Sequence, residues 1–153
     1  MRIVAVSDDV ASGEEGDHRD RRGIAGDLTV FKIAGAAIQA GADLDEAERL
    51  AWKANDATRS LGVAFDGCTL PGAEDALFHV PEGAMAIGLG IHGEPGIDEQ
   101  PMPSAQELAR ILVDGVLEET PELDSDRVAV VLNGLGTVKH EEMFVVWKHA
   151  SRL

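Results

Sequence analysis

A histidine and a glutamate two residues apart are the side chains best suited to chemistry, and they lie in the glycine-rich stretch from Gly88 to Gly96. His92 can act as a base or a nucleophile, because neutral imidazole is well populated near pH 7. Two interpretations are open. One is a buried or turn histidine whose ring nitrogens are hydrogen-bonded, and the other is a reactive imidazole at the mouth of a small pocket.

The residues that lead to His92 predict a strand with two unlike faces. Alternating positions form two sets, Met85, Ile87, Leu89 and Ile91 against Ala86, Gly88, Gly90 and His92. A period of two is typical of a strand. One face is aliphatic, and the other carries almost no side chain before the imidazole, so a ligand or a neighbouring backbone could enter there. Pro95 and Gly96 then turn the chain, because proline has no N–H to donate and glycine adopts unusual φ values.

Five sequence motifs resemble those of the substrate-binding subunit or domain of dihydroxyacetone kinases. They span most of the chain, in the family's order and at similar spacing: RRGIAG from Arg21, KIAGAA from Lys32, GCTLPGA from Gly67, GIHGEPG from Gly90 and VVLNGLG from Val130. The resemblance implies that His92 bonds covalently to the ketone carbon of dihydroxyacetone as a hemiaminal. On this hypothesis Gly90 and Gly93 clear space for the substrate, and Glu94 orients the imidazole or braces the turn.

The chain resembles only the middle-to-C-terminal portion of that subunit. It has neither a GGGSGHEP-like loop nor the aspartate of an NYTGD-like loop, which line the pocket in the family, and it stops before the family's final hairpin region. We therefore expect residues 1–153 to form a single domain of a split or truncated protein. Asp27 stands where the family has a small hydroxyl residue, so ligand affinity is in question if that position faces the pocket.

The resemblance also implies partners. Dihydroxyacetone is the expected ligand, ATP or ADP with Mg²⁺ belongs to a separate nucleotide-binding kinase subunit or domain, and the missing upstream half of the subunit completes the pocket. We expect a homodimer, because open sheet edges favour pairing with another copy or with the missing half. The sequence has no P-loop and no carboxylate motif for Mg²⁺, so we expect no cofactor in this chain.

Composition narrows the class of protein. The 153 residues carry 13 basic and 28 acidic side chains, for a net charge of −15. Such an acidic surface repels nucleic-acid phosphates and anionic lipids, so we expect neither partner. A single cysteine, Cys68, excludes an intrachain disulfide and fits a reducing compartment. With no signal-like start and no apolar run of roughly 18 to 20 residues, we expect a cytoplasmic protein.

The spacing of apolar residues predicts the elements that position the histidine. Helices are expected over 24–40, 43–59, 104–120 and 140–153, and strands over 2–6, 61–70, 85–91 and 127–133. The first strand should be buried on both faces and the last should be central. Phe144 and Trp147 should face the core. This order predicts a layered α/β domain with a mixed β-sheet flanked by helices, which the resemblance makes part of a two-domain subunit.

Three other motifs are weaker. Gly88-x-Gly90-x-x-Gly93 fits a dinucleotide fingerprint, but Pro95 and Gly96 break the chain where a helix should begin. His92-x-Glu94 is half of a zinc-deaminase pattern whose P-C-x-x-C half is absent, so we expect no metal site. A third group, the three arginines Arg19, Arg21 and Arg22, could bind phosphate or pair with the acidic residues around them, and we favour the pairing.

Three hypotheses for function remain. The first is a dihydroxyacetone (glycerone) kinase component, which holds the substrate through His92 for phosphorylation to dihydroxyacetone phosphate by a nucleotide-bearing partner. The donor is then either ATP directly or a phosphoenolpyruvate-driven relay. The second is a non-catalytic, dihydroxyacetone-binding co-regulator that acts through a transcription factor. The third is a stable fragment without independent activity.

Overall fold

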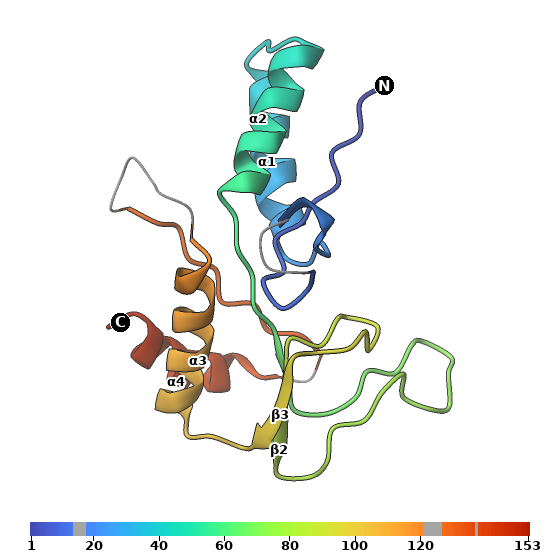
Figure 1. The fold of residues 1–153 in the computed structure, drawn as a ribbon, viewed down its shortest axis with the longest axis vertical. Helices are drawn as coiled ribbons and strands as arrows, with labels where there is room; N and C mark the ends of the chain where they lie inside the picture. Colours follow the sequence, from blue (N-terminus) through green and yellow to red (C-terminus); the bar gives the residue numbers. More distant parts are fainter. Residues whose placement is uncertain (14–17, 121–126, 137) are drawn as a thin grey trace.

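The chain forms two groups of elements (Figure 1), described by a computed structural model over residues 1–13, 18–120, 127–136 and 138–153. The first group is a helical hairpin of α1 (Gly26–Gln39) and α2 (Leu44–Asp56). The second is a small sheet with α3 (Ala105–Glu118) and α4 (His140–Ala150). A short 3-10 helix, η1 (His18–Asp20), precedes α1. No helix in these four ranges is long and apolar enough to span a bilayer.

Small side chains allow the two helices of the hairpin to pack closely. Ala51 and Ala54 of α2 form a buried cluster with Val30 of α1. Helix α2 begins where Asp43 accepts a hydrogen bond from the N–H of Glu46 at 2.9 Å, as the sequence predicts. Both helices are thus confirmed, each a few residues shorter than expected.

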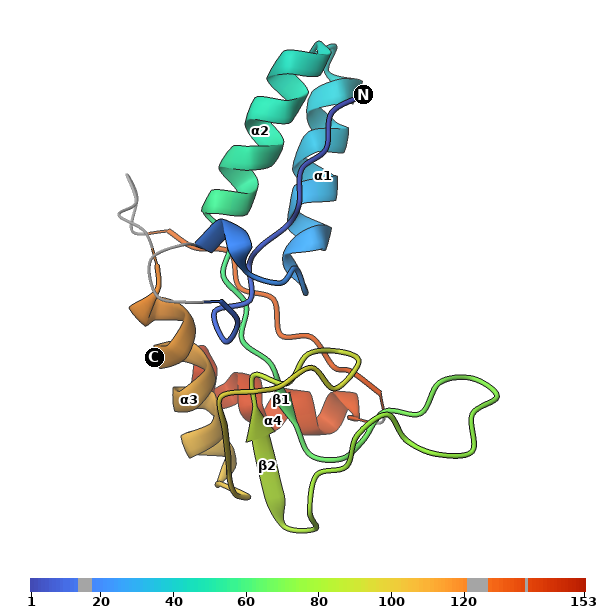
Figure 2. The same ribbon diagram turned by 45° about the vertical axis from the view of Figure 1, so that its right-hand side comes forward.

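The N-terminal segment is not the doubly buried strand that its apolar residues predict. Residues 2–6 run alongside α1 without strand structure (Figure 2). Ile3 is largely exposed. Val4 and Val6 pack against the hairpin cluster instead. A strand needs a neighbour for its hydrogen-bond ladder, and the described part of this segment has only an isolated bridge, between Asp9 and Ser60.

The sheet has three strands in the order β1 (Val63–Ala64), β2 (Ala84–Ile87) and β3 (Asp98–Pro101). Both pairings are antiparallel, with Ile87 opposite Val63 and Asp98. The prediction of a mixed sheet is therefore wrong for the residues that the structure describes. The strand expected to reach His92 ends at Ile87, because Gly88 takes φ +73° and leaves the extended conformation.

A second core lies between this sheet and the helices beside it. Met85 is fully buried, with Ile87 and Leu108 packed around it. Val146 of α4 packs on this cluster, and α3 packs along α4. Ser104 and Glu107 form a capping box at the start of α3, with the Ser104 N–H donating to Glu107 Oε2 at 2.9 Å.

Two expectations for the C-terminal part are wrong. Residues 127–133 form no strand, and Val128, Val130 and Val131 are largely exposed. Phe144 is 70% exposed and Trp147 is 40% exposed, although both were expected to face the core. Among the described residues no strand pairs with 127–133, so the valines of this segment are not covered as residues of a central strand would be.

Candidate functional site

The GIHGEPG motif forms a tight loop between β2 and β3, which we call the His92 loop (residues 88–97). Its two ends are fixed by the sheet: the Gly88 N–H donates to the Gly62 carbonyl at 2.8 Å, and the Ile97 N–H donates to the Ile87 carbonyl at 2.9 Å. Inside the loop, the Gly90 N–H donates to the Glu94 carbonyl and the Gly93 N–H to the Gly90 carbonyl, both at 3.0 Å. The motif is therefore a closed turn rather than the end of a long strand.

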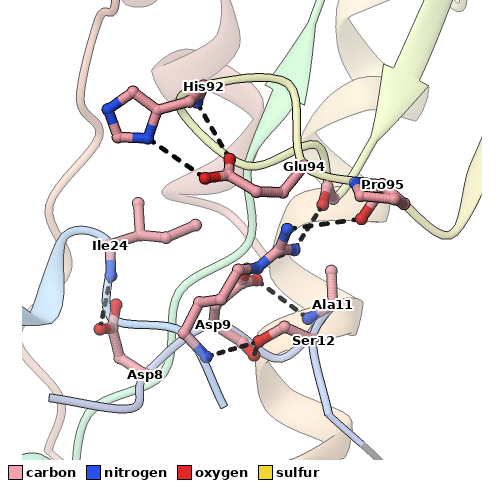
Figure 3. A network of polar contacts seen from close by, with 10 residues as sticks. Asp8, Asp9, Ala11, Ser12, Ile24, His92, Glu94 and Pro95 are labelled. Atoms are coloured by element: carbon pink, nitrogen blue, oxygen red, sulfur yellow. Dashed lines mark hydrogen bonds and ion pairs between the residues drawn. The ribbon is translucent and has the colours of Figure 1, made fainter. Parts of the chain in front are cut away.

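Glu94 contacts His92 through both oxygens of its carboxylate (Figure 3). One oxygen accepts the backbone N–H of His92 at 3.0 Å, and the other lies 3.2 Å from the ring nitrogen Nδ1. Hydrogen bonds from the backbone N–H groups of Glu94 itself and of His92 lower the pKa of the Glu94 carboxyl below its ordinary value. The carboxylate thus both orients the imidazole and braces the turn.

This contact determines which ring nitrogen is free to react. An ionised carboxylate only accepts hydrogen bonds, so Nδ1 of His92 carries the proton when the ring is neutral. The lone pair then lies on Nε2. The His92 side chain is 69% exposed, so Nε2 is accessible from solvent. An imidazole held in this way could act as a base or as a nucleophile.

The two glycines predicted to clear space for a substrate have close neighbours of their own. A Cβ atom on Gly90 would collide with the carboxylate of Glu94. A Cβ atom on Gly93, which has φ +86°, would lie 2.8 Å from Cδ1 of Phe78. Gly90 thus lets the loop close on Glu94, and Gly93 lets it pack against Phe78 with a positive φ. Whether they also admit a substrate stays a prediction.

A hollow of about 330 Å³ lies beside the loop, but His92 does not line it. Its walls come from the segment before β2, from β2, from both ends of the loop and from β3: Phe78, His79, Val80, Ala86, Leu89, Gly96, Ile97, Asp98 and Glu99. The described residues thus do not place His92 at the mouth of this hollow. They also contain no group of three or more His, Cys, Asp or Glu side chains placed to hold a metal ion, and Cys68 does not join His92 and Glu94.

Sequence reasoning missed a pair of buried carboxylates. Asp8 and Asp9 are fully buried. The Asp8 carboxylate accepts the N–H groups of Ile24 at 3.0 Å and of Gly26 at 2.8 Å. Ala25, at the cap position of α1, makes no side-chain cap. Asp8 therefore caps α1 from a position distant in the sequence. The sequence feature that could have indicated this cap is Gly26, where a Cβ atom would overlap the Asp8 side chain.

Asp9 joins Arg22 to the His92 loop. Its carboxylate accepts the Arg22 Nε–H at 3.0 Å and the Ala11 N–H at 3.0 Å. The Arg22 guanidinium then donates to the carbonyl of Gly88 at 2.9 Å and to that of Pro95 at 3.4 Å (Figure 3). Burial raises the pKa of Asp9, and the hydrogen bonds from Ala11 and Arg22 oppose that rise.

All three arginines pair with acidic residues, but only Arg22 pairs with one of the acids near it in the sequence, as expected. Arg22 pairs with Asp9 at 2.8 Å, Arg21 with Glu119 at 3.1 Å and Arg19 with Asp56 at 3.1 Å. Asp27, the residue that departs from the family pattern, is exposed in the first turn of α1.

Comparison with known proteins shows the domain family of the chain. The Dak1 domain family matches residues 1–153. The chain is 65% identical to the L-erythrulose 1-kinase of Mycolicibacterium smegmatis over 151 residues, which is 96% of this chain and 26% of the kinase. It therefore spans about a quarter of that relative's length.

Two solved structures have the same fold. The dihydroxyacetone kinase of C. freundii superposes with a TM-score of 0.83 at 36% identity, over 96% of this chain and 26% of that one. That kinase has also been solved in complex with AMP-PNP and Mg²⁺. The dihydroxyacetone kinase operon co-activator Dha-DhaQ superposes with a TM-score of 0.81 at 28% identity, over 97% of this chain and 46% of that one.

Proposed function

Because the chain belongs to the Dak1 domain family, we propose that it is part of the sugar-binding portion of a ketose kinase, in which His92 bonds covalently to the substrate. One observation carries the proposal: Glu94 holds Nδ1 of His92 and leaves Nε2 exposed at the tip of a closed loop. A ring held in this way needs no reorientation before it attacks a carbonyl carbon.

The proposed step is a reversible addition to the ketone. The Nε2 lone pair forms a bond to the carbonyl carbon, and the π electrons of the C=O bond move to oxygen, which takes up a proton. The ring becomes cationic in this step, and loss of the Nδ1 proton toward Glu94 restores a neutral imidazole. The product is a hemiaminal with every atom of the ketose retained. Glycerol has no electrophilic carbon, so the bond selects ketoses over the polyol.

The substrate is a short ketose with a terminal hydroxymethyl group beside the ketone. Dihydroxyacetone was the expectation from sequence motifs, but the 65% identity to an L-erythrulose 1-kinase makes the four-carbon ketose the first compound to test. The covalent bond would hold either ketose with its terminal hydroxyl in a fixed position for phosphoryl transfer. We propose that a separate nucleotide-bearing subunit or domain supplies the phosphoryl group, in keeping with the AMP-PNP and Mg²⁺ bound by the C. freundii kinase.

Carbon NMR with a ketose labelled at the ketone carbon tests the proposal. We expect a tetrahedral carbon signal with L-erythrulose or dihydroxyacetone, no signal change with labelled glycerol, and loss of the adduct in His92→Ala. His140→Ala, in the exposed first turn of α4, is the matched control and should keep it. An adduct that survives His92→Ala would overturn the proposal. So would its absence even in the full polypeptide that carries this domain.

A second candidate function is a ketose-binding co-regulator that acts through a transcription factor. The TM-score of 0.81 to the operon co-activator favours keeping it. The two functions differ in one measurement: a kinase component supports phosphorylation of the labelled ketose when a nucleotide-bearing partner is added, whereas a co-regulator forms the adduct without turnover.

A further inference from the structure

We propose that Arg22 is a positioning residue for His92, because its guanidinium holds both ends of the His92 loop against a buried carboxylate. The inference rests on the proposed function of His92. Arg22 precedes α1 and lies 66 residues before Gly88 and 73 before Pro95, so the contacts join distant parts of the chain. Its role is to fix where the imidazole stands, not to touch the substrate.

The His92 loop needs an anchor outside itself. His92 and Glu94 bond to each other, and both belong to the loop, so their contact fixes the ring relative to the loop only. The Gly88 N–H and Ile97 N–H bonds fix the ends of the loop to the sheet. Pro95, next to Glu94, is held from outside by Arg22 Nη1 on its carbonyl.

The anchor itself is rigid. Asp9 is fully buried, and the Arg22 side chain is 26% exposed. A planar guanidinium that is bound on one edge by a carboxylate and on the other by carbonyls has a fixed orientation, which a lysine ammonium could not reproduce. The turn after Asp9 also abuts the loop, since a Cβ on Gly88 would collide with the Cβ of Ala11.

The expected effect follows from the sensitivity of covalent chemistry to position. A displacement of about 1 Å at a reacting group can cost on the order of 100-fold in rate. Arg22→Met leaves both carbonyls without their donor, so we expect the rate of adduct formation at saturating ketose to fall roughly 10- to 100-fold. Arg22→Lys keeps the charge beside Asp9 but cannot reach both carbonyls. Its rate of adduct formation should therefore lie between those of the wild type and Arg22→Met.

The test measures loop mobility and adduct formation in the same variants. Hydrogen exchange at the Gly90 and Gly93 amides should accelerate in Arg22→Met, while the α3 amides keep their protection. Arg49→Met is the matched control, because Arg49 pairs with Glu46 on the surface of α2, and it should change neither quantity. If Arg22→Met does not fold, Arg22→Lys alone decides.

The outcomes separate the two proposals. An unchanged adduct rate in a variant whose loop exchanges faster would overturn the positioning role. So would a rate loss accompanied by equally increased exchange in α3, because this would indicate general destabilisation. If the wild-type protein forms no adduct with any ketose, the proposed function fails. Faster loop exchange in Arg22→Met, with unchanged protection in α3, would still show that Arg22 holds the loop.

Discussion

Asp8→Asn hardly changes the shape of the side chain, yet the structure predicts a large decrease in the free energy of unfolding. The Asp8 carboxylate accepts two backbone N–H groups at the start of α1, from Ile24 and Gly26, and is fully buried. An asparagine keeps one acceptor oxygen and turns an NH₂ group toward the other N–H. One hydrogen bond to a charged group is lost, which costs about 1.5 to 3 kcal/mol. The lost charge at the helix N-terminus adds about 0.3 to 1 kcal/mol.

Urea and thermal denaturation followed by circular dichroism measure this effect. We expect the free energy of unfolding to fall by about 2 to 4 kcal/mol, and the Tm to fall by roughly 5 to 12 °C for a domain of this size. Asp43→Asn is the matched control: Asp43 caps α2 from an exposed position, and asparagine caps as well as aspartate. Equal losses in the two variants, or a loss under about 0.5 kcal/mol for Asp8→Asn, would refute the distant cap.

Two further predictions concern the core and the loop. Met85→Ala should lower the free energy of unfolding by about 2 to 5 kcal/mol in urea titrations, because the Met85 side chain is fully buried. Met102 is 47% exposed, so Met102→Ala should lower it by under about 0.5 kcal/mol. Equal effects of the two substitutions would contradict the assigned core. Because the pKa of Glu94 is lowered in the folded protein, its ionised form stabilises the loop above the ordinary value of 4.5, and this stabilisation should disappear as the pH falls through the lowered pKa. Protection factors of the loop amides, which correct for the intrinsic pH dependence of exchange, should therefore fall in acid in the wild type but stay constant with pH in Glu94→Gln. An identical acid response in both would refute this role of Glu94.

The helices could be predicted from sequence because their signals are local. Asp43 and Ser104 accept backbone N–H groups three residues ahead, and such caps do not depend on distant residues. Strands depend on neighbours. The β-branched run from Val128 to Val131 has strong strand propensity, but among the described residues it has no partner strand and stays exposed.

The GIHGEPG motif was identified from the sequence, whereas the residues that support it were not. The GIHGEPG motif contains His92 and the Glu94 that holds it, so their contact follows from two-residue spacing. Arg22 and Asp9 lie far from the motif in sequence, and no local pattern links them to Gly88. Contacts of this kind are set by the tertiary fold, which a single sequence does not give.

Asp8 and Asp9 are neighbours in the chain, yet the first serves α1 and the second serves the His92 loop. Their Cα atoms are about 3.8 Å apart because one peptide unit separates them. An insertion or deletion between them would move one carboxylate out of place. We therefore expect functional relatives to have no insertions or deletions at this point.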